Sequence, residues 1–288
     1  MSTWRSSEGD DGLDFGVPRL SEPRYSQSLE RGLEILGCFS PQRPVLGIAD
    51  IADELGMSRS TTHRYVITLF ALGYLKQNKS RKYRLALGVT ALGMAALNST
   101  GLRENAHPEI KALVRRTNFT SGLAVLDGTD ITFVDRVRGH RRGYQKSALT
   151  INVGSRLPAA VTSLGKLLLA SLPDPERRRI LPEIKLRRHG PNSIMTKAAL
   201  RGELIAIREG GLATNDQELE SGFCSIAAPV RDGSTDVVAA LNLVAPRQAI
   251  VLPELMSDLG PHLIATADVI SARLGYRLET SENGHGDD

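Results

Sequence analysis

The chain has 288 residues, of which 41% are hydrophobic, and a formal net charge of +4, values that favour two packed domains. It contains no run of eighteen apolar residues, and residues 1–20 are polar and acidic. We therefore expect no membrane span and no secretory signal, and a soluble, cytoplasmic protein. Cys38 and Cys224 lie far apart and the six histidines lack paired spacing, so neither a metal nor a cofactor is expected.

The positive charge is concentrated near the N-terminus. Residues 23–87 contain ten Lys/Arg and five Asp/Glu, a net of 10 − 5 = +5, whereas residues 1–22 contain two and five, a net of 2 − 5 = −3. This asymmetry predicts an acidic leader over 1–22, followed by a compact basic domain over 23–87 that suits a nucleic-acid backbone. A further acidic tail is expected over 279–288.

Three helices are predicted within the basic domain. Leu29, Leu33 and Leu36 form one face of a helix over 28–39. After two prolines, a second apolar repeat over 48–55 ends at Gly56, and Ser58 is expected to cap a third helix. Helix, short turn and helix in this order predict a helix-turn-helix whose second helix enters the DNA major groove.

The outer face of the third helix is polar, short-chained and basic. Beyond it, residues 78–81 form the tip of a predicted hairpin, or wing, between short strands. The alternative is a small helical domain that binds protein. The residues predicted to contact DNA are Arg59, Ser60, Thr61, Thr62, His63, Arg64, Lys79, Arg81 and Lys82, although periodicity also places Thr62 with the inward Val66 and Leu69.

A linker helix is expected over 88–104, with an apolar stripe suited either to a partner helix or to its own chain. The following segment, 105–278, has a mixed α/β pattern that predicts a sheet flanked by helices. One helix is expected to begin near Pro108, and three more are expected over 164–172, 197–209 and 253–274. The expected strands cover 122–126, 131–137, 147–153, 224–230 and 237–244.

Catalytic chemistry is not indicated in this second domain. Gly165-Lys166 lacks the earlier glycine and the following hydroxyl of a phosphate loop, and no histidine lies near Cys224 in sequence. No catalytic residue is therefore expected. Asn242 and Ser163 instead interrupt apolar runs, as polar groups in a small-molecule pocket do, although satisfied buried polar groups would give the same pattern.

Several segments together resemble the IclR-type transcriptional regulators: 27–33, 48–52, 55–61, 72–75, 85–97, 154–158, 163–166 and 215–222. The resemblance covers nearly the whole chain apart from its ends. It implies a winged helix-turn-helix, a linker helix used in dimerisation and a GAF-like effector-binding domain. The partners it implies are a double-stranded DNA operator, a small organic acid and a second copy of the chain, with a tetramer left open.

The same resemblance implies an effector site made of Ser163, Leu164, Asn215, Ser225, Asn242 and Val244. Arg136 and Arg156 are candidate partners for a carboxylate. Where the family commonly has Leu-Arg, this chain has Phe223-Cys224, which changes the expected charge of the pocket. The resemblance favours an aromatic acid of protocatechuate or β-ketoadipate catabolism, and the alternative effector is a short keto acid such as glyoxylate.

Overall fold

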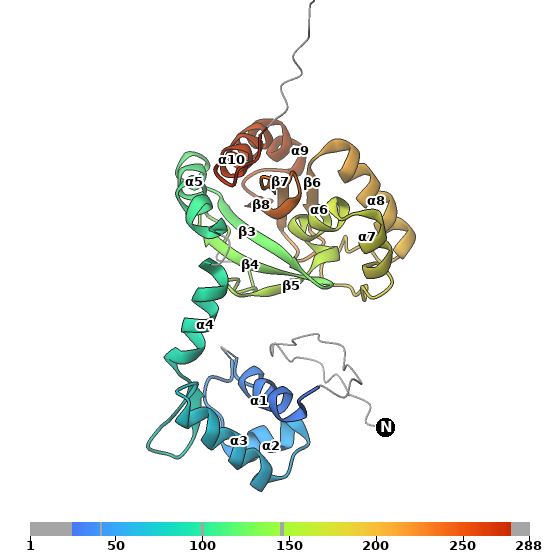
Figure 1. Cartoon of the computed structure of the whole chain (residues 1–288). Helices are drawn as coiled ribbons and strands as arrows, with labels where there is room; N and C mark the ends of the chain where they lie inside the picture. The colour runs from blue at the N-terminus through green and yellow to red at the C-terminus, as the bar shows by residue number, and fades with distance from the viewer. Residues whose placement is uncertain (1–24, 41, 99–100, 145–146, 278–288) are drawn as a thin grey trace, which may run out of the picture. The chain divides into compact units, whose positions relative to one another are not determined.

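The structure, a computed structural model, describes residues 25–40, 42–98, 101–144 and 147–277. The chain divides after Ala96 into two compact units, and each is described separately (Figure 1). The predicted acidic leader (1–22) and acidic tail (279–288) lie outside the described residues.

The first unit consists of three helices, a hairpin and most of a fourth helix. Its elements are α1 (Gln27–Gly37), α2 (Ile48–Leu55), α3 (Arg59–Ala71), β1 (Leu75–Gln77), β2 (Tyr83–Leu85) and α4 (Leu87–Asn98). Gly56 ends α2 in the left-handed conformation, with φ 62°, and the Ser58 side chain caps α3 by accepting from Thr61 N. These two residues set the turn that separates α2 from α3, as the sequence predicts.

The core of this unit lies between the three helices and the hairpin, around Ile35, Ile51 and Val66. The leucine face predicted for α1 contributes little to it, because Leu29 is 64% exposed and Leu33 is 50% exposed. Ile35 and Gly37 are the buried residues of this helix, and Leu36 packs against the core partly buried. The spacing of the leucines therefore identified an apolar face, but not the face that the chain itself buries.

The second unit is built on one antiparallel sheet of the order β5-β4-β3-β8-β7-β6. Its strands are β3 (Thr120–Asp127), β4 (Asp130–Val137), β5 (Arg156–Pro158), β6 (Ala213–Asp216), β7 (Phe223–Arg231) and β8 (Val237–Pro246). The central strands β3, β8 and β7 are buried on both faces. Their alternating side chains therefore divide the core into two clusters, one on each side of the sheet.

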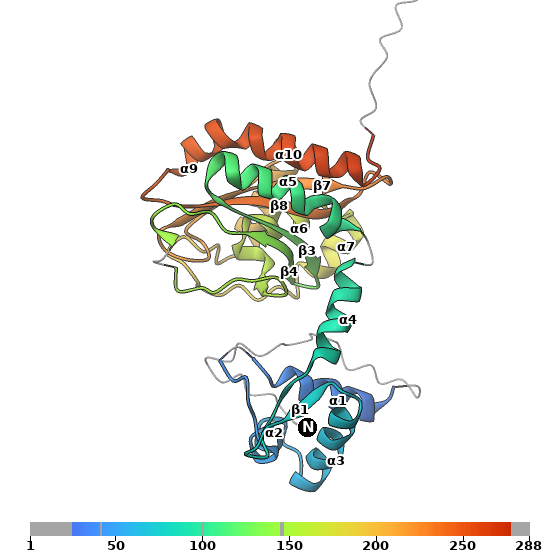
Figure 2. The same ribbon diagram turned by 90° about the vertical axis from the view of Figure 1, so that its left-hand side faces the viewer.

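Helices cover both faces of this sheet (Figures 1 and 2). α5 (Leu102–Thr117) and α10 (Gly260–Arg273) lie side by side on one face, and α10 continues from the short α9 (Leu252–Glu254) and a π-helical turn (Leu255–Leu259). On the other face lie α6 (Ser163–Ser171), α7 (Asp174–Ile180) and α8 (Lys197–Gly210), with the 3-10 turn Ala159–Val161 before α6. No helix in the described ranges is long and apolar enough to cross a membrane.

Two predicted elements are wrong. The helix expected to begin near Pro108 begins at Leu102, after a left-handed Gly101, and it accommodates Pro108 in its interior. The expected strand over 147–153 is a loop: Ser147 Oγ and Ala148 N donate to Glu220, and Leu149, Thr150 and Ile151 line a cavity. β6 and α7 were not predicted, since four residues and seven residues are too short to show a period.

Candidate functional site

The exposed face of α3 is the first candidate site. Arg59, Ser60, His63 and Arg64 are exposed together with Ile67, as predicted. Ser58 fixes the first turn through its hydroxyl, which lies 3.1 Å from Ser60 Oγ and donates to Thr61 Oγ1 at 2.8 Å. No ion pair involves Arg59 or Arg64 within the described part of the chain, so both guanidiniums are available to a partner beside the hydroxyls of the first turn.

Thr62 does not belong to this surface. Its side chain is 0% exposed, and Oγ1 donates to Ser58 O at 3.1 Å. The prediction that Thr62 contacts DNA is therefore wrong, because a side chain packed beside Val66 in the core cannot reach a base without unfolding the helix. The periodicity that placed Thr62 on the inner side was the better guide.

The hairpin β1–β2 carries the second group of cations. Asn78 orders its loop, because Asn78 Oδ1 accepts from Ser80 N at 3.0 Å and from Lys82 N at 2.9 Å. Arg81 adopts a left-handed φ of 58° at the tip. Lys79, Arg81 and Lys82 are exposed, and the hairpin contains no acidic residue that could neutralise them.

The second candidate site is a cavity of about 270 Å³ in the second unit. This volume lies at the small end of the range for ligand pockets and suits a small metabolite. Among its lining residues are all seven that the sequence assigned to the effector: Arg136, Ser163, Leu164, Asn215, Ser225, Asn242 and Val244. The structure brings them together, and their role in binding remains a prediction.

Strand register explains why residues far apart in sequence meet here. Directly paired residues point to the same face of a sheet, and one row runs across four strands as Asn215, Ser225, Val244 and Thr120. A second row runs across four strands as Ala227, Asn242, Gly122 and Arg136. Gly122 keeps the space open, since a Cβ there would lie 2.8 Å from the Phe133 ring and 3.2 Å from Asn242 Oδ1.

The first turn of α6 forms another wall of the cavity. Thr162 caps the helix by accepting from Gly165 N at 2.9 Å, and the hydroxyls of Ser163 and Ser225 lie 2.8 Å apart. The first amides of a helix have no intrahelical acceptor and carry the positive end of the helix dipole. Ser163 and Leu164, which line the cavity, therefore present a wall that favours an anion or a hydrogen-bond acceptor.

Arg136 supplies a cation to the same cavity. Its guanidinium lies 5.8 Å from the centre of the Phe133 ring, and Nε is buried with no hydrogen-bond partner among the described residues. Burial, and then the nearby charge of Arg138, lowers the pKa of Arg136 to about 10, so it remains protonated at neutral pH. Arg138 also lines the cavity, but it donates to Asn152 Oδ1 at 3.2 Å.

Other polar groups around the cavity are committed to the fold. Asn215 Nδ2 donates to Val161 O at 2.6 Å, and Asn215 Oδ1 accepts from Glu218 N at 3.3 Å. Asn242 Oδ1 accepts from Gly122 N at 2.9 Å, which leaves its amide nitrogen to the cavity. Asn215 therefore shapes the site, whereas Asn242 retains a donor for a ligand.

Tyr144 and Glu220 are among the lining residues that sequence reasoning did not assign to the effector. Tyr144 donates its hydroxyl to Val244 O and accepts from Thr120 N at 2.7 Å, and burial raises its pKa above the ordinary value. Glu220 accepts from Ser147 Oγ at 2.7 Å and from Ala148 N at 2.6 Å, which fastens the loop that was expected to be a strand. No local signal in the sequence indicates either contact.

Two other predictions have a clear outcome. Arg156 does not line the cavity, because it pairs with Asp127 at 2.8 Å and with Asp130 at 3.4 Å, so its candidacy as a carboxylate partner is wrong.

Cys224 is buried on β7, where its thiol donates to Ala245 O at 3.8 Å. Burial raises the pKa of Cys224 to about 11, which keeps the thiol protonated and poorly nucleophilic. Over the described ranges, no group of three or more His, Cys, Asp or Glu is placed to hold a metal.

Comparison with known proteins gives the class to which this architecture belongs. Residues 28–79 match the IclR helix-turn-helix domain, and residues 94–272 match the bacterial transcriptional regulator IclR C-terminal domain. The chain therefore belongs to the IclR family of transcriptional regulators, which are DNA-binding regulators and not enzymes. The predicted family and the predicted α/β fold with an N-terminal winged domain are confirmed.

Individual relatives extend over most of the chain. It is 32% identical to the HTH-type transcriptional regulator XynR of Escherichia coli over 87% of this chain and 98% of the relative. It is also 32% identical to the Pca regulon regulatory protein of Pseudomonas putida, over 85% and 83%. The solved structure of an IclR homolog from Microbacterium hydrocarbonoxydans, complexed with 4-hydroxybenzoate, superimposes with a TM-score of 0.75 at 27% identity, over 86% and 98%.

Proposed function

We propose that this regulator binds a small carboxylic acid in the cavity of its second unit, and that the acid alters operator binding by the first unit. The observation that carries the proposal is the Arg136 guanidinium, which is partly buried at the cavity without an acidic partner among the described residues. Buried charges are ordinarily paired, and a carboxylate is the natural partner of a guanidinium. A bound acid would supply the missing partner.

The rest of the lining favours an aromatic acid. Apolar side chains surround the polar groups, among them Phe133, Ile151, Leu157, Leu164, Leu219 and Phe223. A ring would bury apolar surface against them, whereas glyoxylate has almost none to offer. Ser163, Ser225 and the free Asn242 amide provide hydrogen bonds for a ring hydroxyl. We therefore place the effector with the protocatechuate or β-ketoadipate acids, and keep the short keto acid as the competing outcome.

The first unit would bind DNA through two distinct surfaces. The exposed α3 residues Arg59, Ser60, His63 and Arg64, with the partly exposed Thr61, would enter the major groove and read bases. Lys79, Arg81 and Lys82 in the hairpin would contact phosphates, which adds salt-dependent affinity and little sequence information. A pseudo-palindromic operator would match two such units in a dimer.

The exposed apolar surfaces of the first unit suit contact with a second copy of the chain. In α4, Leu92 is 58% exposed and Leu87 is more exposed still, and α1 leaves Leu29 and Leu33 uncovered. Exposed apolar helix faces of this kind commonly mark protein–protein contacts. We propose that a homodimer covers them.

The acid-binding proposal is tested by thermal unfolding of the full chain with benzoate, 4-hydroxybenzoate, protocatechuate and glyoxylate. We expect the aromatic acids to raise the melting temperature in proportion to the logarithm of their concentration, and Arg136→Met to need about 10- to 100-fold more acid for the same rise. A shift with glyoxylate alone would select the keto acid. If none of these acids stabilised the protein, the proposal would be overturned.

A further inference from the structure

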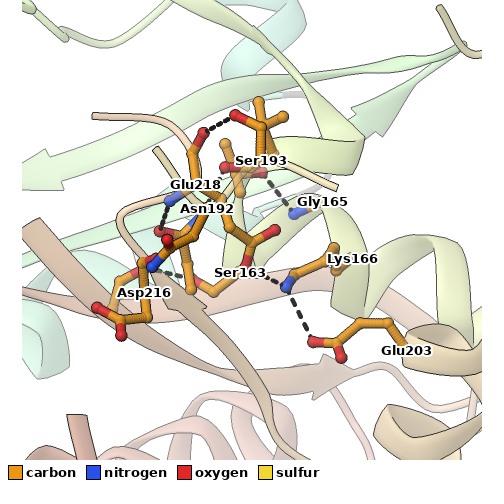
Figure 3. A network of polar contacts seen from close by, with 12 residues as sticks. Ser163, Gly165, Lys166, Asn192, Ser193, Glu203, Asp216 and Glu218 are labelled. Carbon is orange, nitrogen blue, oxygen red and sulfur yellow. Dashed lines mark hydrogen bonds and ion pairs between the residues drawn. The ribbon is translucent and has the colours of Figure 1, made fainter. Parts of the chain in front are cut away.

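Lys166 follows the cavity-lining start of α6, yet its side chain is turned away from the cavity and is only 1% exposed. Its Nζ donates to Glu218 Oε1 at 2.5 Å and to Glu203 Oε1 at 2.9 Å (Figure 3). Gly165 beside it is explained by packing, since a Cβ there would lie 2.3 Å from Ala159 Cα. The Gly165-Lys166 pair, which resembled part of a phosphate loop, is therefore built into the protein interior.

Glu218 belongs to the acidic loop, residues 215–222, which supplies Asn215, Leu219 and Glu220 to the cavity lining. Glu218 itself does not line the cavity, and its carboxylate contacts Lys166 (Figure 3). Lys166 and Glu218 thus connect the wall made by α6 to the wall made by the acidic loop, although neither side chain lines the cavity.

The backbone of the acidic loop is held in an unusual conformation. Glu218 O accepts from Ser193 Oγ at 2.7 Å and from Gly190 N at 2.8 Å. Gln217 has a left-handed φ of 59°, which is uncommon outside glycine, so neighbouring contacts have to maintain it. A Cβ on Gly190 would lie 2.1 Å from Gln217 O, so the loop and the 190–193 segment fit together without spare space.

The charge on Glu218 depends on its partner. Burial raises the pKa of this carboxyl, the attraction of Lys166 opposes that rise, and Oε2 is buried without a hydrogen-bond partner among the described residues. If Lys166 were removed, the carboxylate would have to take up a proton or move toward water. Movement of Glu218 would carry Leu219 and Glu220 with it, and Glu220 holds Ser147 and Ala148 of a second loop that lines the cavity.

We infer that the buried Lys166–Glu218 ion pair is a positioning device that fixes the acidic loop against α6, and so sets the affinity of the cavity for its acid. The ligand part of this inference rests on the proposed function. The positioning part concerns the ligand-free protein and can be measured without a ligand.

The test compares Lys166→Met, the double variant Lys166→Met/Glu218→Met and the control Glu203→Gln in the full chain. Glu203 contacts the same ammonium from α8, but it is not part of the acidic loop. Three quantities are measured for each: hydrogen exchange of residues 215–222 without ligand, the melting temperature, and the dissociation constant for 4-hydroxybenzoate.

We expect Lys166→Met to accelerate exchange in the acidic loop about tenfold or more and to lower the melting temperature, because it leaves a buried charge unpaired. The double variant removes that charge and should recover the melting temperature while the loop still exchanges rapidly. Glu203→Gln should change loop exchange by less than about threefold, since Lys166 keeps its contact with Glu218. Affinity for 4-hydroxybenzoate should fall about tenfold in both Lys166 variants and stay near wild type in the control.

If the double variant recovered both slow exchange of the acidic loop and the melting temperature, the inference would be overturned, and the pair would have a merely structural role. Equal acceleration by Glu203→Gln would overturn it as well. If wild-type protein did not bind 4-hydroxybenzoate while loop exchange followed the expected pattern, the proposed effector would be wrong and the positioning role would stand.

Discussion

The surface of α3 and the hairpin in the first unit and the cavity of the second unit use polar residues in opposite ways. On α3 and the hairpin, Arg64 and Lys79 are exposed and have no acidic partner within the described residues. Around the cavity, most polar groups are already bonded to the protein, and Arg136 has an unpaired buried nitrogen. The first surface therefore suits a large polyanion bound through many additive contacts, whereas the second suits a small ligand that depends on few contacts.

The largest effect should come from Arg136, where one contact carries much of the binding. Arg136→Met should weaken affinity for the effector acid by about 10- to 100-fold, because a charge-assisted hydrogen bond contributes about 1.5–3 kcal/mol. Isothermal titration with the acid that stabilises the wild type measures the loss. Arg156→Met is the matched control, since Arg156 pairs with Asp127 outside the cavity. Equal losses in both variants would contradict the role assigned to Arg136.

A substantial but smaller loss is expected at α3, where several residues share the contact. His63→Ala and Arg64→Ala should each weaken binding to the chain's own upstream DNA by about tenfold, while binding to unrelated DNA should change less. Fluorescence anisotropy with both DNAs separates the two effects. Unchanged affinity in both variants would contradict the assignment of α3 as the recognition helix.

The hairpin should affect salt dependence more than sequence preference. Replacing Lys79, Arg81 and Lys82 by alanine should reduce the slope of log affinity against log salt by about one for each lost phosphate contact. The matched control replaces the exposed Arg178, Arg179 and Lys185 of the second unit, which removes the same charge elsewhere. If both triple variants had the same slope, net charge and not the hairpin would be responsible.

The smallest effect on operator affinity is expected for a substitution of Thr62, which tests where the proposed DNA-binding surface of α3 ends. Thr62→Val removes the buried hydrogen bond to Ser58 O and should lower the free energy of unfolding by about 1 kcal/mol. Operator affinity at a temperature where the variant is folded should stay within about twofold of wild type. Chemical denaturation and anisotropy measure the two quantities. A tenfold loss of affinity without loss of stability would return Thr62 to the DNA interface.

The same contrast explains what the sequence could predict. The surface of the first unit depends on local periodicity and on the caps Gly56 and Ser58, so α2, α3 and the exposed His63 and Arg64 follow directly from residue spacing. The exception was α1, whose leucine face is mostly exposed in the single chain. Periodicity shows that a face is apolar, but it does not show whether the chain itself or a partner buries it.

The cavity depends on strand register, which short segments do not reveal. Asn242, Gly122 and Arg136 become neighbours only through the pairing of β8, β3 and β4. Family resemblance supplied six of the lining residues, whereas Tyr144 and Glu220 act through contacts 100 and 73 residues away. The sequence offered Arg136 and Arg156 as equal candidates for a carboxylate partner. Only the structure shows that Arg156 is paired with two aspartates.

The central claim is that occupation of the cavity alters DNA binding by the same chain. The most direct measurement is the affinity of wild type and Arg136→Met for the chain's upstream DNA at fixed salt, over a titration with 4-hydroxybenzoate. We predict that the acid changes the dissociation constant of the wild type for DNA about fivefold or more, and that the variant needs about 10- to 100-fold more acid for the same change. An acid that binds the wild type without changing its DNA affinity, or one that acts on Arg136→Met at the same concentrations as on the wild type, would contradict the account.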